Sequence, residues 1–109
     1  MRDESLAHNE ELFRNVNERI ETVSQTVARD DTMMEYLCEC DKPYCYERVR
    51  ATREEYESVR AEATHFIILA GHEDRRVEIV ILSNERFLVV EKQGAAARDA
   101  EETDPREHT

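Results

Sequence analysis

The sequence predicts a single α+β domain with a long helix first, a short helix in the middle and three antiparallel strands after it. Three observations predict it: a helical apolar repeat near the N-terminus, three cysteines within eight positions, and three β-branched runs in the second half. With 109 residues, of which 39% are hydrophobic and 38% charged, the chain can form one modest core and not two. There is no Trp, and the three Phe and four Tyr are few, so we expect this core to need a further cross-link.

The first element is a long amphipathic helix from residue 5 to about residue 27, after a flexible N-terminus at 1–4. Its apolar residues recur at spacings of one, three and four positions, and they are Leu12, Phe13, Val16, Ile20, Val23 and Val27. The polar residues expected to face solvent are Asn9, Glu10, Arg14, Glu18 and Glu21. We expect the protein's own sheet to cover the apolar stripe, and a homodimer through this helix is the alternative.

The second element is a cysteine turn. Cys38 and Cys40 lie two apart in a short extended segment, 36–40, and therefore point to the same side. Pro43 predicts a tight turn that brings Cys45 back to them, on a surface marked by charged neighbours such as Glu39. An odd number of cysteines cannot all pair internally, and three thiolates supply three corners of a tetrahedral zinc site. The spacing predicts bound zinc, and a reduced cluster without metal is the alternative.

The remaining elements follow from local signals. Thr52 and Glu55 have the spacing of a capping box, which predicts a short helix from about 53 to 61. Apolar runs at 65–70, 77–82 and 86–91 predict strands, and Asn84 suits the tight turn between the last two. Together they predict a three-stranded antiparallel β-meander. Residues 94–109 lack large apolar side chains and predict a disordered acidic tail, which leaves 5–93 as the zinc-stabilised domain.

The fourth zinc ligand must be found outside the cysteine turn, and the candidates are His65 and His72. A helix of about ten residues at 1.5 Å and a strand of about five residues at 3.3 Å have similar lengths. The strand that follows the short helix should therefore return the chain to the cysteine turn near residue 72. We predict His72 as the ligand and keep His65 as the alternative.

Four protein ligands fill a tetrahedral zinc ion and leave no position for a reactive water. A metalloprotease-type His-Glu-x-x-His motif is absent, because Arg76 stands where the second histidine would follow His72. We therefore expect no enzyme, and predict a protein-interaction or regulatory module with structural zinc. A redox- or zinc-responsive thiolate sensor is the alternative, because oxidised thiolates release zinc. A metal-dependent enzyme ranks third.

Charge and hydropathy restrict the partners. The net charge is −11, with acidic residues in every segment, and this surface should repel phosphate backbones. We expect a protein partner, of unknown identity, and no nucleic acid. No basic N-terminal segment leads into an apolar run, and no stretch approaches the roughly 18 apolar residues of a membrane span. We therefore expect a cytoplasmic protein that does not bind membranes.

Taken together, the motifs resemble a family of short, uncharacterised bacterial proteins without an established activity. The resemblance covers roughly positions 9–92. It rests on Tyr36-Leu37-Cys38-Glu39-Cys40 with Cys45, the helix that begins at Thr52, Gly71-His72-Glu73 and the segment that ends at Lys92. It implies a shared metal-site pattern that includes Gly71-His72-Glu73, and so supports His72.

Overall fold

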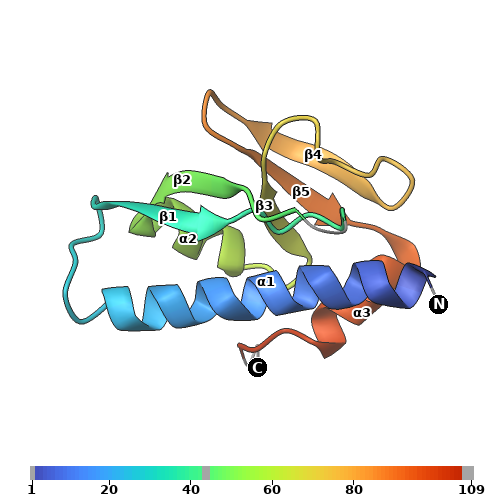
Figure 1. The fold of residues 1–109 in the computed structure, drawn as a ribbon, viewed down its shortest axis with the longest axis horizontal. Helices are drawn as coiled ribbons and strands as arrows, with labels where there is room; N and C mark the ends of the chain where they lie inside the picture. The colour runs from blue at the N-terminus through green and yellow to red at the C-terminus, as the bar shows by residue number, and fades with distance from the viewer. Residues whose placement is uncertain (1, 43–44, 107–109) are drawn as a thin grey trace.

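The computed structural model describes residues 2–42 and 45–106, with side chains from Glu10 onward. Its elements are α1 (Arg2–Ser24), β1 (Met33–Leu37), β2 (Arg48–Thr52), α2 (Arg53–Arg60), β3 (His65–Ile68), β4 (Glu78–Ser83), β5 (Leu88–Lys92) and α3 (Gly94–Glu102). The predicted combination of helices with antiparallel strands is confirmed. In Figure 1, α1 runs along one side of the molecule, with β1, β2 and α2 above it and α3 beside its N-terminal half. None of the helices in the described range has the length and apolar character needed to cross a membrane.

β1 and β2 form a two-stranded antiparallel sheet on either side of the cysteine loop, with Tyr36 opposite Val49. The sequence analysis predicted only an extended segment at 36–40 and missed β2. A signal for β2 is nevertheless present, because Val49 and Ala51 are buried while Arg48 and Arg50, which alternate with them, are exposed. This alternation is typical of a strand with one face on the core.

The second sheet has three strands in the order β3-β5-β4, and both pairings are antiparallel. The predicted meander, which would have β4 in the centre, is therefore wrong. The physical reason is burial: the first three residues of β5 are all buried, whereas Ile79, Ile81 and Leu82 of β4 are 43–50% exposed. The strand that is apolar on both faces takes the central position, and the half-exposed strand takes the edge.

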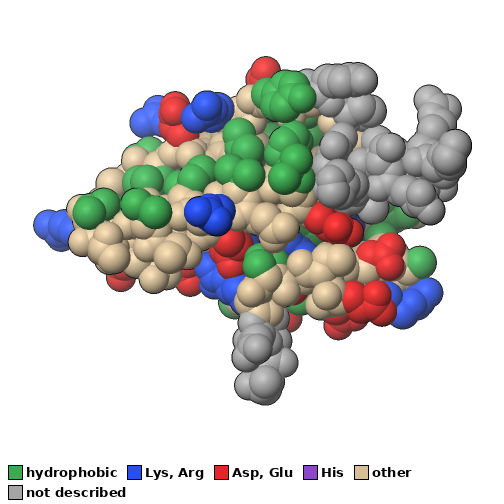
Figure 2. Space-filling view, turned by 60° about the horizontal axis from the view of Figure 1, so that its bottom comes forward, with side chains coloured by type: hydrophobic (Ala, Val, Ile, Leu, Met, Phe, Trp, Pro, Cys, Tyr) green, Lys and Arg blue, Asp and Glu red, His purple; other side chains and the backbone are tan. Residues whose placement is uncertain are grey.

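α1 begins and ends three residues earlier than predicted, so residues 2–4, expected to be flexible, lie in the helix. Its orientation also differs from the prediction. Leu12 is 46% exposed, Val23 66% and Val27 81%, while the residues buried with Phe13 include Arg14 and Glu21. Figure 2, which brings this side of the molecule forward, shows hydrophobic side chains gathered in a band from the left of the view toward its centre. The helix therefore buries a largely polar face and exposes much of its apolar stripe.

Hydrogen bonds explain why polar residues of α1 can be buried. Arg14 donates to the carbonyl oxygens of Ala63 at 2.8 Å and Ala100 at 2.9 Å. Glu21 accepts from the Tyr36 hydroxyl at 3.0 Å and forms an ion pair with Arg53 at 3.1 Å. Buried polar groups with such partners cost little, whereas the same groups without partners would oppose folding. The helix is thus docked by specific polar contacts.

Residues 94–106 differ from the disordered tail that the sequence predicted. Residues 94–102 form α3, and Ala100 is 5% exposed against the core. Beyond the helix, Asp104 pairs with Arg60, and Arg106 donates to Glu18 at 2.8 Å and to Glu57. Small alanines let the helix approach closely, and the ion pairs of Asp104 and Arg106 fix the segment that follows it. Residues 107–109 lie outside the described range.

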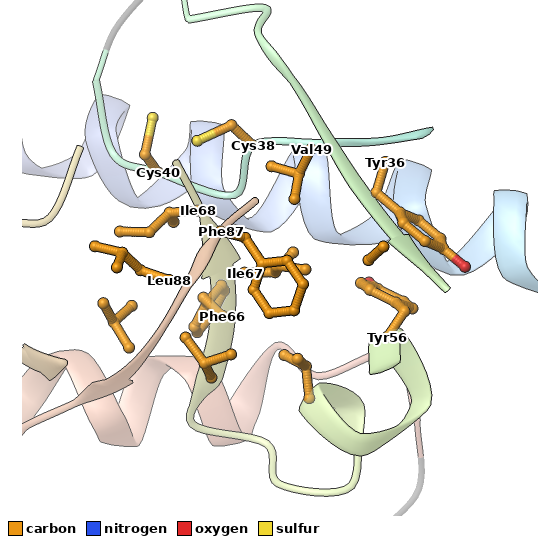
Figure 3. Packing of buried hydrophobic residues seen from close by; sticks show 14 of the residues in the cluster. Tyr36, Cys38, Cys40, Val49, Tyr56, Phe66, Ile67, Ile68, Phe87 and Leu88 are labelled. Atoms are coloured by element: carbon orange, nitrogen blue, oxygen red, sulfur yellow. The ribbon is translucent and has the colours of Figure 1, made fainter. Parts of the chain in front are cut away.

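The apolar core lies between the two sheets, α1 and α2. Tyr36 and Tyr56 stack with ring centroids 4.2 Å apart, as Figure 3 shows, and the fully buried Ile67 belongs to the same cluster. Burying a large apolar side chain stabilises a fold by about 1.5–3 kcal/mol. The same cluster extends to Cys38 and Cys40, so these two cysteines belong to the core instead of the surface.

Candidate metal centre

The four predicted ligands come from three segments that meet at one end of the core. Cys38 directly follows β1, Cys40 and Cys45 lie in the loop before β2, and His72 lies in the loop after β3. Backbone hydrogen bonds fix the first segment, because Cys38 donates to the Glu47 carbonyl at 2.9 Å. Gly71 has φ of +90°, a region that favours glycine, and this turn directs the chain so that His72 returns toward the cysteines.

The ligand atoms of Cys38, Cys40, Cys45 and His72 all lie within 4.8 Å of one another. His72 Nδ1 is 3.6 Å from the Sγ atoms of both Cys38 and Cys45. In a tetrahedral zinc site, with Zn–S bonds of about 2.3 Å and Zn–N bonds of about 2.0 Å, sulfur and nitrogen lie about 3.5 Å apart. The three cysteines are free thiols. The arrangement can therefore bind a metal ion through three sulfurs and one nitrogen.

His65, the alternative fourth ligand, is not part of this cluster. It begins β3, pairs with Glu91 across the sheet, and its Nε2 lies 3.1 Å from the Glu91 carboxylate. The comparison of helix and strand lengths predicted that the two histidines lie at opposite ends of the segment 65–72, with His72 at the cysteines. The structure has the same arrangement.

Burial and hydrogen bonding shift the pKa values of the three thiols in different directions. A hydrogen bond from the Cys38 thiol lowers the pKa of Cys40 to about 5, against the effect of burial. The same hydrogen bond, together with burial, raises the pKa of Cys38, and burial raises that of Cys45. The Leu69 amide donates to Cys38 Sγ at 3.3 Å. Thiolates that bind metals commonly accept such amide hydrogen bonds, which orient the ligand.

Glu39, between the first two cysteines, is the main supporting residue that the sequence analysis missed. The expectation that it marks a surface turn is wrong, because it is fully buried. Its Oε2 accepts from Asn17 Nδ2 and from the Tyr56 hydroxyl, both at 2.8 Å, and its Oε1 accepts from the Ile67 amide at 3.1 Å. Burial raises its pKa. A signal existed: if Cys38 and Cys40 point to one side, Glu39 must point to the other, toward the core.

Glu73 supports the turn that carries His72. Its carboxylate accepts from the Gly71 amide at 2.8 Å and pairs with Arg75 at 3.3 Å. The backbone of the same turn is closed by a hydrogen bond from the His72 amide to the Leu69 carbonyl at 3.1 Å. Of the Gly71-His72-Glu73 motif, His72 therefore supplies the candidate ligand atom, while Gly71 and Glu73 set its position.

None of the protein-family models, curated proteins or solved structures that were compared with the chain matches it. The resemblance to the short bacterial family stays a prediction. The candidate function therefore rests on the geometry of the four ligands and of the residues that hold them.

Proposed function

We propose that this chain is a small zinc-binding module for protein interaction or regulation, in which Cys38, Cys40, Cys45 and His72 hold one structural Zn²⁺. The observation that carries the proposal is the pair of 3.6 Å sulfur–nitrogen separations at His72, which match the edge of a tetrahedral zinc site. Thiolate and imidazole ligands together are typical of zinc, whereas Mg²⁺ and Ca²⁺ prefer oxygen.

A structural role is supported by what the ligands connect. Three of them belong to the β1–β2 unit, and His72 belongs to the loop after β3, in the other sheet. Between the two units, the Glu39 amide donates to the Ile67 carbonyl at 2.8 Å. A metal ion at this place would cross-link the two small sheets beside a lean core. Structural zinc binding contributes directly to the free energy of folding.

Catalysis is the less favoured role for the ion. A catalytic zinc normally has three protein ligands and a water, whereas four protein donors are gathered here. The three cysteines are also buried, with Cys38 1%, Cys40 2% and Cys45 8% exposed. A substrate would have little access to an ion held among them.

A redox- or zinc-responsive thiolate sensor is the second candidate, favoured by the close approach of three free thiols. Oxidation of two of them to a disulfide by a peroxide would remove two ligands and release the ion. The burial of the sulfurs disfavours this role, because oxidants reach exposed thiolates first. Zinc release by stoichiometric peroxide from the native protein would support the sensor, and resistance would support the structural role.

The test compares two histidine variants of protein purified under reducing conditions. We expect close to one zinc per chain by elemental analysis in the unchanged protein and in His65→Ala. His72→Ala should lose zinc affinity and thermal stability together, because it removes one ligand of a site linked to folding. His65→Ala is the matched control, since it removes an imidazole of the same strand segment outside the cluster.

Three results would contradict the proposal. The first is the absence of zinc from reduced, unchanged protein. The second is zinc loss in His65→Ala with retention in His72→Ala. The third is a melting temperature of the zinc-loaded protein that does not fall when a strong chelator removes the ion.

A further inference from the structure

The exposed apolar stripe of α1 is a narrow seam along the helix. It consists of Leu12, Val16, Ile20, Val23 and Val27, and helix-type hydrogen bonds continue past Ser24 to Ala28. At 3.6 residues per turn the five positions span an arc of about 80°. Leu12, Val23 and Val27 are between 46% and 81% exposed. Ile20 is partly buried and packs against the core. Such a seam has the width of a coiled-coil contact and not that of a helix face covered by a sheet.

Four of the five seam residues are placed symmetrically about a point between residues 19 and 20. If a second copy of the helix runs antiparallel across it, Leu12 lies opposite the second copy of Val27, and Val16 lies opposite that of Val23. Ile20 then lies close to its own copy beside the two-fold axis. An interface between identical chains must be self-complementary in this way, because each residue contacts its symmetric counterpart. A seam shaped for an unrelated partner would need no such symmetry.

Charge also favours a second copy on this face. Between Leu12 and Val27 the one exposed charged residue in the described helix is Arg19, because Arg14 and Glu21 are buried and Glu18 binds Arg106. The chain as a whole carries a net charge of −11, so two copies repel each other over most of their surfaces. Along this stretch of the helix they can approach without opposing acidic side chains, and the two copies of Arg19 flank the two-fold axis at the edge of the seam.

We propose that the chain forms a symmetric homodimer through the outward seam of α1, with the two helices antiparallel. The contact is about 23 Å long, from 15 residue steps at 1.5 Å, and it leaves the metal centre of each copy intact. Tyr46 of the cysteine loop, 69% exposed and in edge contact with Phe13 at 6.0 Å, lies beside the seam. The dimer does not depend on the proposed function, because no metal ligand takes part in it.

The test measures molar mass by sedimentation equilibrium from about 10 µM to 1 mM on the full chain. We expect the mass to rise from 12.8 kDa toward twice that value in the unchanged protein. Val16→Glu and Val23→Lys should each stay monomeric over this range. An equimolar mixture of the two variants should recover the dimer, because antiparallel pairing places the new glutamate opposite the new lysine. Zinc content and circular dichroism of each variant check that it is folded.

Ile79→Lys is the matched control, since Ile79 is 50% exposed on the edge strand β4. It should dimerise as the unchanged protein does. A mass that stays at 12.8 kDa up to 1 mM would overturn the proposal. Loss of the dimer in Ile79→Lys, with retention in Val23→Lys, would move the interface to β4 and also overturn it. If the single variants are folded monomers and their mixture stays monomeric, the antiparallel register is wrong.

Discussion

Replacing Glu39 by glutamine tests whether the cysteine loop depends on the buried Glu39 carboxylate. The substitution conserves size and shape but exchanges one oxygen for an amide nitrogen, which donates instead of accepting. Both Glu39 oxygens accept in the structure: one from the Ile67 amide, the other from Asn17 and the Tyr56 hydroxyl. Whichever way the glutamine is oriented, at least one buried donor faces another donor.

The expected magnitude follows from the groups that lose their partner. A buried polar group without a hydrogen bond costs about 1–3 kcal/mol, and hydrogen bonds to a charged acceptor are at the strong end. For Glu39→Gln, with one or two donors left unpaired, we expect a loss of about 2–4 kcal/mol in the free energy of unfolding. Small domains are stable by about 5–15 kcal/mol, so this is a large fraction of the total.

Urea unfolding of the zinc-loaded protein, followed by circular dichroism, measures this loss as a shift of the midpoint at an unchanged slope. Glu35→Gln is the matched control, because Glu35 lies on β1 with its carboxylate exposed and 3.9 Å from Arg48. Its effect should stay below about 0.5 kcal/mol. If Glu39→Gln is as mild as Glu35→Gln, the carboxylate network does not support the cysteine loop and our account of its buried position is wrong.

Two further predictions concern distant parts of the fold. Truncation after Gln93 removes α3 and, with it, the Ala100 carbonyl that accepts from Arg14; we expect the melting temperature to fall by about 10 °C or more, and an unchanged value would mean that the segment is not docked. Arg86 binds both oxygens of Glu55, at 2.8 and 2.6 Å, and this lowers the pKa of Glu55 to about 2 from an ordinary 4.5. A depressed carboxyl pKa stabilises the fold at neutral pH, and the contribution is lost as the pH falls from 4.5 toward 2. Arg86→Met should therefore cost about 1–2 kcal/mol at pH 7, after allowance for partial exposure, in an unfolding assay. The difference from the unchanged protein should shrink below pH 4.5, and a difference independent of pH would contradict the assignment.

Local signals predicted the elements whose determinants lie close together in the sequence. The capping box is present as expected, with the Glu55 amide donating to Thr52 Oγ1 at 3.1 Å and the Thr52 amide donating to Glu55 Oε1 at 2.8 Å. His72 could be placed near the cysteines because the lengths of a helix and a strand are fixed by backbone geometry. These inferences needed no knowledge of side-chain packing.

The orientation of α1 could not be predicted in this way. Periodicity shows that a helix has an apolar stripe, but not that the stripe faces the core. The face of α1 that packs on the core is determined by hydrogen-bond partners far along the chain. For Arg14, these partners are the carbonyls of Ala63 and Ala100. The prediction of the strand order was wrong for a related reason, since the sequences of β4 and β5 are both apolar runs and do not show which strand is central. The docked segment at 94–106 was missed because its contacts depend on small alanines and ion pairs, which carry no apolar signal.

X-ray absorption spectroscopy at the zinc edge, on the protein as purified under reducing conditions, tests the metal centre most directly. The ligands Cys38, Cys40, Cys45 and His72 predict three sulfur atoms at about 2.3 Å and one nitrogen at about 2.0 Å from the ion, with the outer-shell scattering of one imidazole. In His72→Ala the imidazole signal should disappear, while His65→Ala should retain it. A first shell with two or fewer sulfur atoms, or an imidazole signal that persists in His72→Ala, would contradict the account.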